Sequence, residues 1–142
     1  MNLTPRRIAA LSTASLAAAG LAFTGTAIAA TTPANHNPFG RIDRVTVTST
    51  GASVLGWAAD PDNLKTPLAV DLAVDHKVLI KAKTGLPRPD VAKKEHTGPD
   101  QGFAATAMLE PGTHTLCITA INIDAGKNTS LGCRTVTIPK SA

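Results

Sequence analysis

Aromatic side chains are scarce in this sequence of 142 residues, which has no tyrosine, one tryptophan and three phenylalanines. Proteins that recognise sugars often stack the sugar ring on an exposed aromatic ring. Here Trp57 and Phe103 fall in segments that alternate apolar and polar residues, so we expect both in the core. A carbohydrate-binding role would therefore have to depend on polar contacts.

Residue combinations typical of catalytic and metal sites are also missing. The four histidines and two cysteines do not have the spacing of a zinc motif. There is no G-x-S-x-G nucleophile motif, and Gly126-Lys127 lacks the upstream glycine and following Ser/Thr of a phosphate-binding loop. We therefore expect a non-enzymatic protein without a metal or other cofactor. The histidines, each expected on the surface, are His36, His76, His96 and His114.

The first thirty residues have the pattern of a secretory signal peptide. Arg6 and Arg7 precede an uncharged Ala/Leu-rich segment, and small residues at Ala27 and Ala29 follow in the spacing of a cleavage site. An uncleaved membrane anchor over residues 8–34 is the alternative. The arginine pair leaves general secretion and twin-arginine export both open.

Removal of residues 1–30 leaves a nearly neutral chain. It keeps 12 of the 14 basic residues and all 10 acidic residues, a formal net charge of +2. This balance gives no basic footprint for nucleic acid. We expect a secreted or cell-envelope protein with no membrane contact after cleavage, as a monomer with a linker at 31–40 and one domain at 41–140.

Apolar residues recur with a period of two through this domain, which is typical of half-buried strands. In residues 68–75, for example, every second side chain is leucine or valine. We expect strands at 45–48, 53–59, 68–75, 78–82, 103–109, 114–123 and 130–138, with a tight turn at 75–77. Seven short strands without a long amphipathic helix predict an all-β protein, an antiparallel β-sandwich of immunoglobulin-like or fibronectin-III-like type.

The two cysteines, Cys117 and Cys133, are expected to form a disulfide, because an exported protein folds in an oxidising compartment. If residues 124–126 form a three-residue hairpin loop with Gly126 at positive φ, paired residue numbers sum to 250 and the cysteines lie directly opposite. Such pairs have Cα atoms about 4.5 to 5.5 Å apart, within reach of a disulfide. The bond would then join neighbouring strands of one sheet, unlike the antibody disulfide that joins two sheets.

Asp60, Asp62 and Asn63 stand between two expected strands and resemble the start of a calcium loop. A complete loop needs glycine at the sixth position and glutamate at the twelfth, where this sequence has Lys65 and Asp71. Asp-Pro and Asp-Asn pairs also form turns in which the side chain accepts backbone hydrogen bonds. We favour the turn, and calcium binding is the alternative.

Residues 84–102 form the one long segment without a strand pattern. Pro89 as first helical residue, Asp90 in the first turn and two lysines after it predict one or two helical turns. A loop of this length is either a crossover between sheets or a functional segment.

This segment is the candidate binding surface, and its candidate contact residues are Arg88, Asp90, His96 and Asp100. Arg88 also has a structural interpretation. Its planar guanidinium suits an ion pair that fixes the loop, and Asp60 is the partner we consider.

Several short motifs follow one another along residues 37–138. They are NPFG with the following R-ID-R-V, GWAADPD at 56–62, RPDV at 88–91, GF at 102–103, PGTHTLCITAIN at 111–122 and LGCRTVTI at 131–138. The ordered set resembles a module of domain size in secreted proteins of high-GC Gram-positive bacteria, which often occurs in tandem or beside cell-wall amidases and peptidases. The resemblance implies a secreted accessory β-domain and carries no catalytic residues.

The sequence thus predicts a secreted, non-enzymatic accessory or interaction module. Its partner would be a protein or a cell-wall component. The alternative is polar recognition of carbohydrate or peptidoglycan at the cell wall through residues 84–102.

Overall fold

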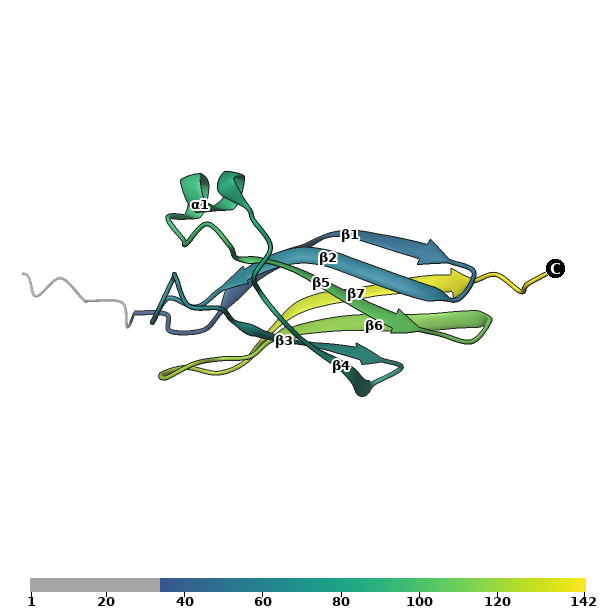
Figure 1. The fold of residues 1–142 in the computed structure, drawn as a ribbon. Coiled ribbons are helices and arrows are strands. Elements are labelled where there is room, and N and C mark those ends of the chain that lie inside the picture. The colour runs from purple at the N-terminus through teal and green to yellow at the C-terminus, as the bar shows by residue number, and fades with distance from the viewer. Residues whose placement is uncertain (1–33) are drawn as a thin grey trace, which may run out of the picture. The chain divides into compact units, whose positions relative to one another are not determined.

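A computed structural model describes residues 34–142, and these form two antiparallel β-sheets that pack face to face (Figure 1). The three-stranded sheet has the order β1-β2-β5, from β1 (Phe39–Thr48), β2 (Gly51–Ala59) and β5 (Gly102–Met108). The four-stranded sheet has the order β4-β3-β6-β7, from β3 (Ala69–Val74), β4 (Lys77–Lys83), β6 (Gly112–Ala120) and β7 (Thr129–Ile138). The prediction of an all-β sandwich with seven antiparallel strands is confirmed. The signal peptide expected at residues 1–30 lies outside the described residues.

The core lies between the two sheets and comes from alternate residues of the strands. In β3, Val70, Leu72 and Val74 are buried, whereas the residues between them are half-buried on the other face. Phe103 is buried in the same cluster, as expected. Burial of every second side chain removes apolar surface from water while the intervening positions stay polar or small.

Trp57 is buried, as expected, but it packs apart from the main core cluster. Its ring lies 5.7 Å from that of Phe39 in an edge-to-face pair. A cavity of about 280 Å³ has Trp57 on one side and Val91 and Lys94 of helix α1 (Pro89–Glu95) on the other. Both faces of β2 are therefore covered at this point, and alternation alone cannot say which face is the interior.

The β3-β4 connection is a two-residue turn, which confirms the tight turn expected at 75–77. Val74 pairs with Lys77, and the two residues between them, Asp75 and His76, have φ of 49° and 69°. Positive φ at both central positions is the geometry of a type I′ hairpin turn, which matches the twist of the flanking strands.

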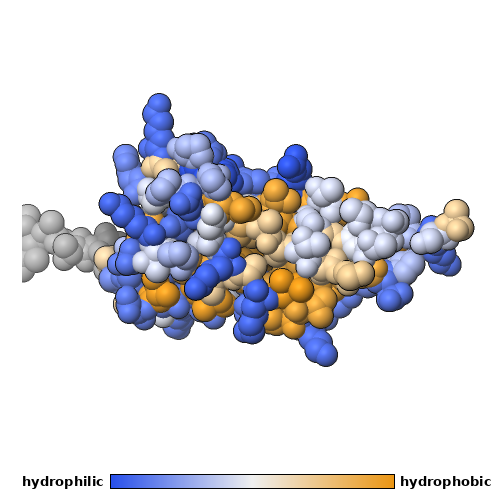
Figure 2. All heavy atoms as spheres, viewed as in Figure 1, coloured by the Kyte–Doolittle hydropathy of each residue, from blue (hydrophilic) through white to orange (hydrophobic). Residues whose placement is uncertain are grey.

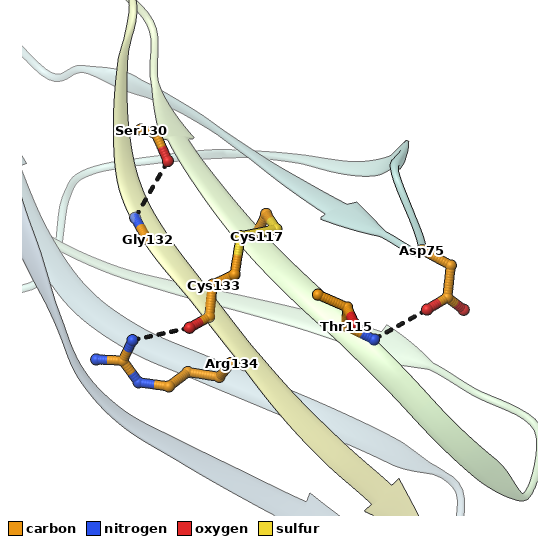
Figure 3. The surroundings of a disulfide bond; sticks show 7 residues. All are labelled: Asp75, Thr115, Cys117, Ser130, Gly132, Cys133 and Arg134. Atoms are coloured by element: carbon orange, nitrogen blue, oxygen red, sulfur yellow. Dashed lines mark hydrogen bonds between the residues drawn. A yellow bond between two sulfur atoms is a disulfide. The ribbon is translucent and has the colours of Figure 1, made fainter.

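The pairing of Cys117 with Cys133 across β6 and β7 is confirmed, and the two form a disulfide with a Cα–Cα distance of 4.1 Å (Figure 3). The neighbouring Leu116 and Ile118 are buried, whereas Cys133 is exposed. The bond therefore lies on the outer face of the four-stranded sheet and joins adjacent strands of that sheet.

The connection between these two strands differs from the prediction. β6 ends at Ala120 and β7 begins at Thr129, so eight residues rather than three separate them. The pairing register also shifts between Ile118 and Thr119, although Gly126 does have the expected positive φ, 99°. The physical reason lies in the aspartates after β2, which take up backbone N–H groups of this connection.

Residues 84–102 cross from β4 in one sheet to β5 in the other and contain the expected helix, α1 (Figure 1). Pro89 is at its start, Asp90 in its first turn and Lys93 and Lys94 in its last. The left-handed residue that ends it is His96, with φ of 57°. Within residues 34–142, no helix is long and apolar enough to cross a bilayer.

Candidate functional site

Asp60 is fully buried and both of its carboxylate oxygens accept hydrogen bonds from the backbone. One oxygen accepts from Asp62 N at 2.9 Å and the other from Ile123 N at 3.0 Å. The carboxylate of Asp62 accepts from Ala125 N at 3.0 Å and pairs with the His36 ring. We call Asp60 and Asp62 the aspartate clamp, because together they hold the β6-β7 connection against the end of β2.

The aspartate clamp favours the turn interpretation over a calcium loop. Asn63 N donates to the Asp60 carbonyl at 3.1 Å, as the chain reverses after β2. Each oxygen of the clamp carboxylates already has a partner within the chain, as expected for side chains that stabilise a turn. Within residues 34–142, no three His, Cys, Asp or Glu side chains are grouped so as to hold a metal ion.

The segment before β1 packs against the same connection. Lys127 N donates to Asn37 Oδ1 at 2.8 Å, and His36 pairs with Asp62. A Cβ added to Gly126 would lie 2.7 Å from the His36 carbonyl oxygen. The close packing of this connection against His36 therefore requires glycine at position 126. Part of the segment expected as a linker at 31–40 is thus ordered, and β1 already begins at Phe39.

Arg88 lies at the start of helix α1 and binds two carboxylates. Its Nε and Nη2 donate to the two oxygens of Asp90 at 2.9 and 2.8 Å, and its Nη1 donates to Asp43 at 2.6 Å. The hydrogen bonds from Arg88 lower the pKa of Asp90 to about 2, and Asp90 in turn raises the pKa of Arg88. Asp60 is not the partner of Arg88, because its carboxylate is already bound by the backbone.

Asp43 reaches Arg88 because β1 carries an extra residue at this point. The register with β2 shifts between Ile42 and Arg44, so Asp43 is the bulged residue. A bulge lets two successive side chains leave the sheet on the same side and redirects them. The bulge therefore places Asp43 beneath the crossover segment and Arg44 beside it.

A groove of about 500 Å³ lies where the crossover segment overhangs the outer face of the three-stranded sheet. Its lining residues are Asp43, Arg44, Leu55, Gly56, Leu86, Pro87, Arg88, Gly102 and Phe103. The wall residue Leu86 is 46% exposed. A Cβ added to Gly102 would lie 2.8 Å from the Arg88 side chain, so the segment packs directly on the start of β5.

The structure brings together only part of the residue set predicted for binding. Arg88 lines the groove, and Asp90 binds Arg88 without lining the groove itself. His96 and Asp100 are exposed but do not belong to the groove lining.

The predicted site residues did not include Asp43, Arg44 or the two groove leucines, Leu55 and Leu86. A signal for the bulge was present, since the inward-facing Ile42 and Val45 are three residues apart rather than two. No local signal brings Leu55 and Leu86 to the same groove, because their proximity depends on the path of the crossover segment.

A second apolar feature lies on β4, the edge strand of the four-stranded sheet. Val78 and Leu79 are 49% and 51% exposed, and Leu79 stands at a register shift. In Figure 2 hydrophobic residues gather across the middle of the visible face, with hydrophilic residues towards both ends. Lysines at 77, 81 and 83 and the irregular register are devices that protect a sheet edge from unwanted strand pairing.

His114 forms a polar link between β6 and the β3-β4 turn. Its Nδ1 lies 2.7 Å from Asp75 Oδ2, and its Nε2 lies 2.8 Å from the Glu110 carbonyl oxygen. Asp75 also accepts from Thr115 N at 2.9 Å (Figure 3). Since both partners of the ring are acceptors, the doubly protonated imidazolium fits this site best. Asp75 first, and then the Glu110 carbonyl, raise the pKa of His114.

The His114 link is expected to make thermal stability depend on pH. Because its pKa is higher in the folded than in the unfolded protein, its contribution is complete below the unfolded value of about 6.5 and is lost as the pH rises through the folded value. The melting temperature of the wild type minus that of His114→Gln should therefore fall as the pH rises above about 6.5. Asp75 stays ionised over this range, because the bond from Thr115 and then that from His114 lower its pKa. A difference that does not change with pH would contradict the charged link.

Comparisons with known proteins leave the family open. No family model matches the sequence, and no curated protein matches it. Among solved structures, the family 28 exopolygalacturonase of Yersinia enterocolitica aligns with 71% of this chain at 11% identity and a TM-score of 0.38. The alignment spans 21% of the enzyme. A match this distant carries no functional inference.

Proposed function

We propose that this protein is a secreted, non-enzymatic β-sandwich module that binds a partner outside the cell through the groove beneath residues 84–102. The partner is a protein or a component of the cell wall. The observation that carries the proposal is a pre-formed groove in which ion pairs fix the overhanging segment while Leu86 remains exposed.

The fixed segment favours binding because a rigid site loses little conformational entropy when its partner arrives. Arg88 uses three nitrogens to connect the segment to Asp43 in β1 and to Asp90 in helix α1. Leu86 N and O also bond to Gly102 at the start of β5. The groove thus exists before any ligand binds, as is usual for binding sites.

Two further features support action outside the cell. The disulfide between Cys117 and Cys133 is compatible with an oxidising compartment, where such bonds persist. The signal-peptide pattern at residues 1–30 and the resemblance to secreted accessory modules point the same way.

The proposal predicts that a charge placed in the groove abolishes partner binding without unfolding the protein. Leu86→Asp should reduce retention on isolated cell walls, or capture of a secreted partner from culture medium, by about tenfold or more, because burying an unpaired carboxylate opposes docking. Lys83→Asp on β4, outside the groove lining, is the matched control and should bind like the wild type. Unfolding curves of both variants check that the fold is intact. Equal retention of Leu86→Asp and the wild type would refute the groove as the site.

Polar recognition of carbohydrate or peptidoglycan is the second candidate, and a row of hydroxyl groups favours it. Thr46 pairs with Ser53, and Ser53 pairs with Thr106, across all three strands of the sheet. Ser53 Oγ and Thr106 Oγ1 are 2.7 Å apart. The row lies two residues along the strands from Arg44 and Leu55, on the same face, so a sugar chain could extend from the groove along it.

Substitution of the hydroxyl row separates the two candidates. Thr106→Val keeps the shape of the side chain and removes its hydroxyl group. Retention on purified cell-wall polysaccharide that falls in Thr106→Val and in Leu86→Asp alike would favour the carbohydrate candidate. Retention that depends on Leu86 alone would favour an apolar contact with a protein or peptide.

A further inference from the structure

Most ionic groups of the groove are already engaged with one another. Arg88 donates to Asp43 and Asp90, and the second oxygen of Asp43 accepts from Arg41 Nε at 3.1 Å. These groups fix the crossover segment and balance one another electrostatically. They therefore leave little charge for a ligand to neutralise.

Arg44 is the exception among the groove residues. It is exposed, and within residues 34–142 its guanidinium forms no hydrogen bond and no ion pair. It follows the bulged residue Asp43 in β1 and lines the groove. A guanidinium presents a planar pair of donors that matches both oxygens of a carboxylate.

The surface beside Arg44 is aliphatic. Leu55 pairs with Arg44 across β1 and β2, and Leu86 and Pro87 form the facing wall. Gly56 adds no side chain to the floor. The groove therefore offers an apolar recess next to one unpaired cation.

We propose that the groove captures the free carboxyl terminus of an extended peptide that ends in an aliphatic residue. The terminal carboxylate pairs with the guanidinium of Arg44, and the last side chain packs between Leu55 and Leu86. This inference rests on the groove being the binding site, as proposed above, and adds the chemical class of the ligand. Capture of peptide carboxyl termini is a recognised mode of peptide recognition.

Charge and apolar lining together favour a peptide terminus over an acidic sugar. A sugar acid could also pair with Arg44, but its ring hydroxyls would then face Leu55, Leu86 and Pro87. Hydroxyl groups that lose water without gaining a partner oppose binding. An aliphatic side chain binds the same surface favourably, because the contact removes apolar area of both the side chain and the groove from water.

The test compares one small probe in two forms. N-acetyl-Gly-Leu with a free carboxylate is titrated into isotopically labelled protein, and its carboxamide form is the matched control. We expect saturable shifts of the Arg44, Leu55 and Leu86 amide signals with a dissociation constant of about millimolar, as for a small ligand. The carboxamide should bind about tenfold more weakly or not measurably, because it lacks the charge. Equal shifts with both forms, or shifts confined to other residues, would overturn the inference.

Two variants give the second arm of the experiment. Arg44→Gln should lose about tenfold in affinity for the free acid and become insensitive to the change from acid to amide. Arg134→Gln is the control, since it removes an exposed arginine from β7 in the other sheet and should bind like the wild type. Unchanged affinity in Arg44→Gln contradicts the role of Arg44.

The outcomes also separate this inference from the proposed function. If Leu86→Asp abolishes partner retention while Arg44→Gln leaves it unchanged, the groove is the site and the carboxylate ligand is wrong. If glucuronate, used as a third probe, shifts the groove signals with an affinity equal to that of the peptide acid, the peptide class is overturned. If neither substitution affects retention, both proposals fail.

Discussion

Replacement of Asp60 with alanine is expected to lower the free energy of unfolding by about 3 to 4 kcal/mol, because two hydrogen bonds from backbone N–H groups to a charged acceptor are lost at a buried site. Asp62 N and Ile123 N donate to this carboxylate, which has no exposed surface. Alanine supplies no acceptor, so two backbone N–H groups would be left without a partner at a buried site. Urea unfolding followed by tryptophan fluorescence measures the change, since Trp57 is the only tryptophan.

Asp62→Ala is the matched control for this prediction. Asp62 lies two residues away in the same turn, and its carboxylate binds Ala125 N and the His36 ring near the surface. We expect a loss of about 1 kcal/mol, because water can replace it at the exposed N–H. Asp60→Asn should fall between the two variants, since the amide retains one acceptor oxygen. Equal losses in the two alanine variants would show that burial of Asp60 does not decide its contribution.

The aspartate clamp also shows which part of the fold the sequence could predict. Alternation of apolar side chains is a local signal, and it placed the buried residues of β3 correctly. The disulfide register was inferred from an expected three-residue loop, and the pairing of Cys117 with Cys133 is observed although the connection is longer. The predicted length of the β6-β7 connection was wrong because Ile123 N in this connection donates to Asp60, which is 63 residues away in the chain. A turn signal within residues 124–126 carries no information about that distant acceptor.

The groove shows a similar limit for the candidate site. Residues 84–102 were predicted as the binding segment because long segments without a strand pattern are uncommon in compact domains and are often functional. The residue type of Arg88 was enough to predict an ion pair. Its partner Asp43, however, is 45 residues away in the chain and reaches Arg88 because of the bulge in β1. The spacing of Ile42 and Val45 could have indicated the bulge, whereas the groove formed with Leu86 required the three-dimensional path of the crossover.

Removal of the disulfide should have the second large effect on stability. The double variant Cys117→Ser/Cys133→Ser is expected to lose about 3 kcal/mol on the chain-entropy model, because the bond closes a loop with a sequence separation of 16. For a domain of this size the melting temperature should fall by roughly 12 °C. Calorimetry of both proteins in oxidising buffer measures the difference. In buffer with a thiol reductant that reduces the bond, the two melting temperatures should converge.

The disulfide and the aspartate clamp act on the same stretch of chain, but in different states. The bond restricts residues 117–133 mainly in the unfolded protein, whereas Asp60 binds Ile123 only in the folded one. The losses from Asp60→Ala and from the double cysteine variant should therefore add to within about 0.5 kcal/mol when combined. A combined loss much smaller than this sum would mean that the bond also holds the connection in place for Asp60 in the native protein. That outcome would assign part of the stabilisation to the folded state.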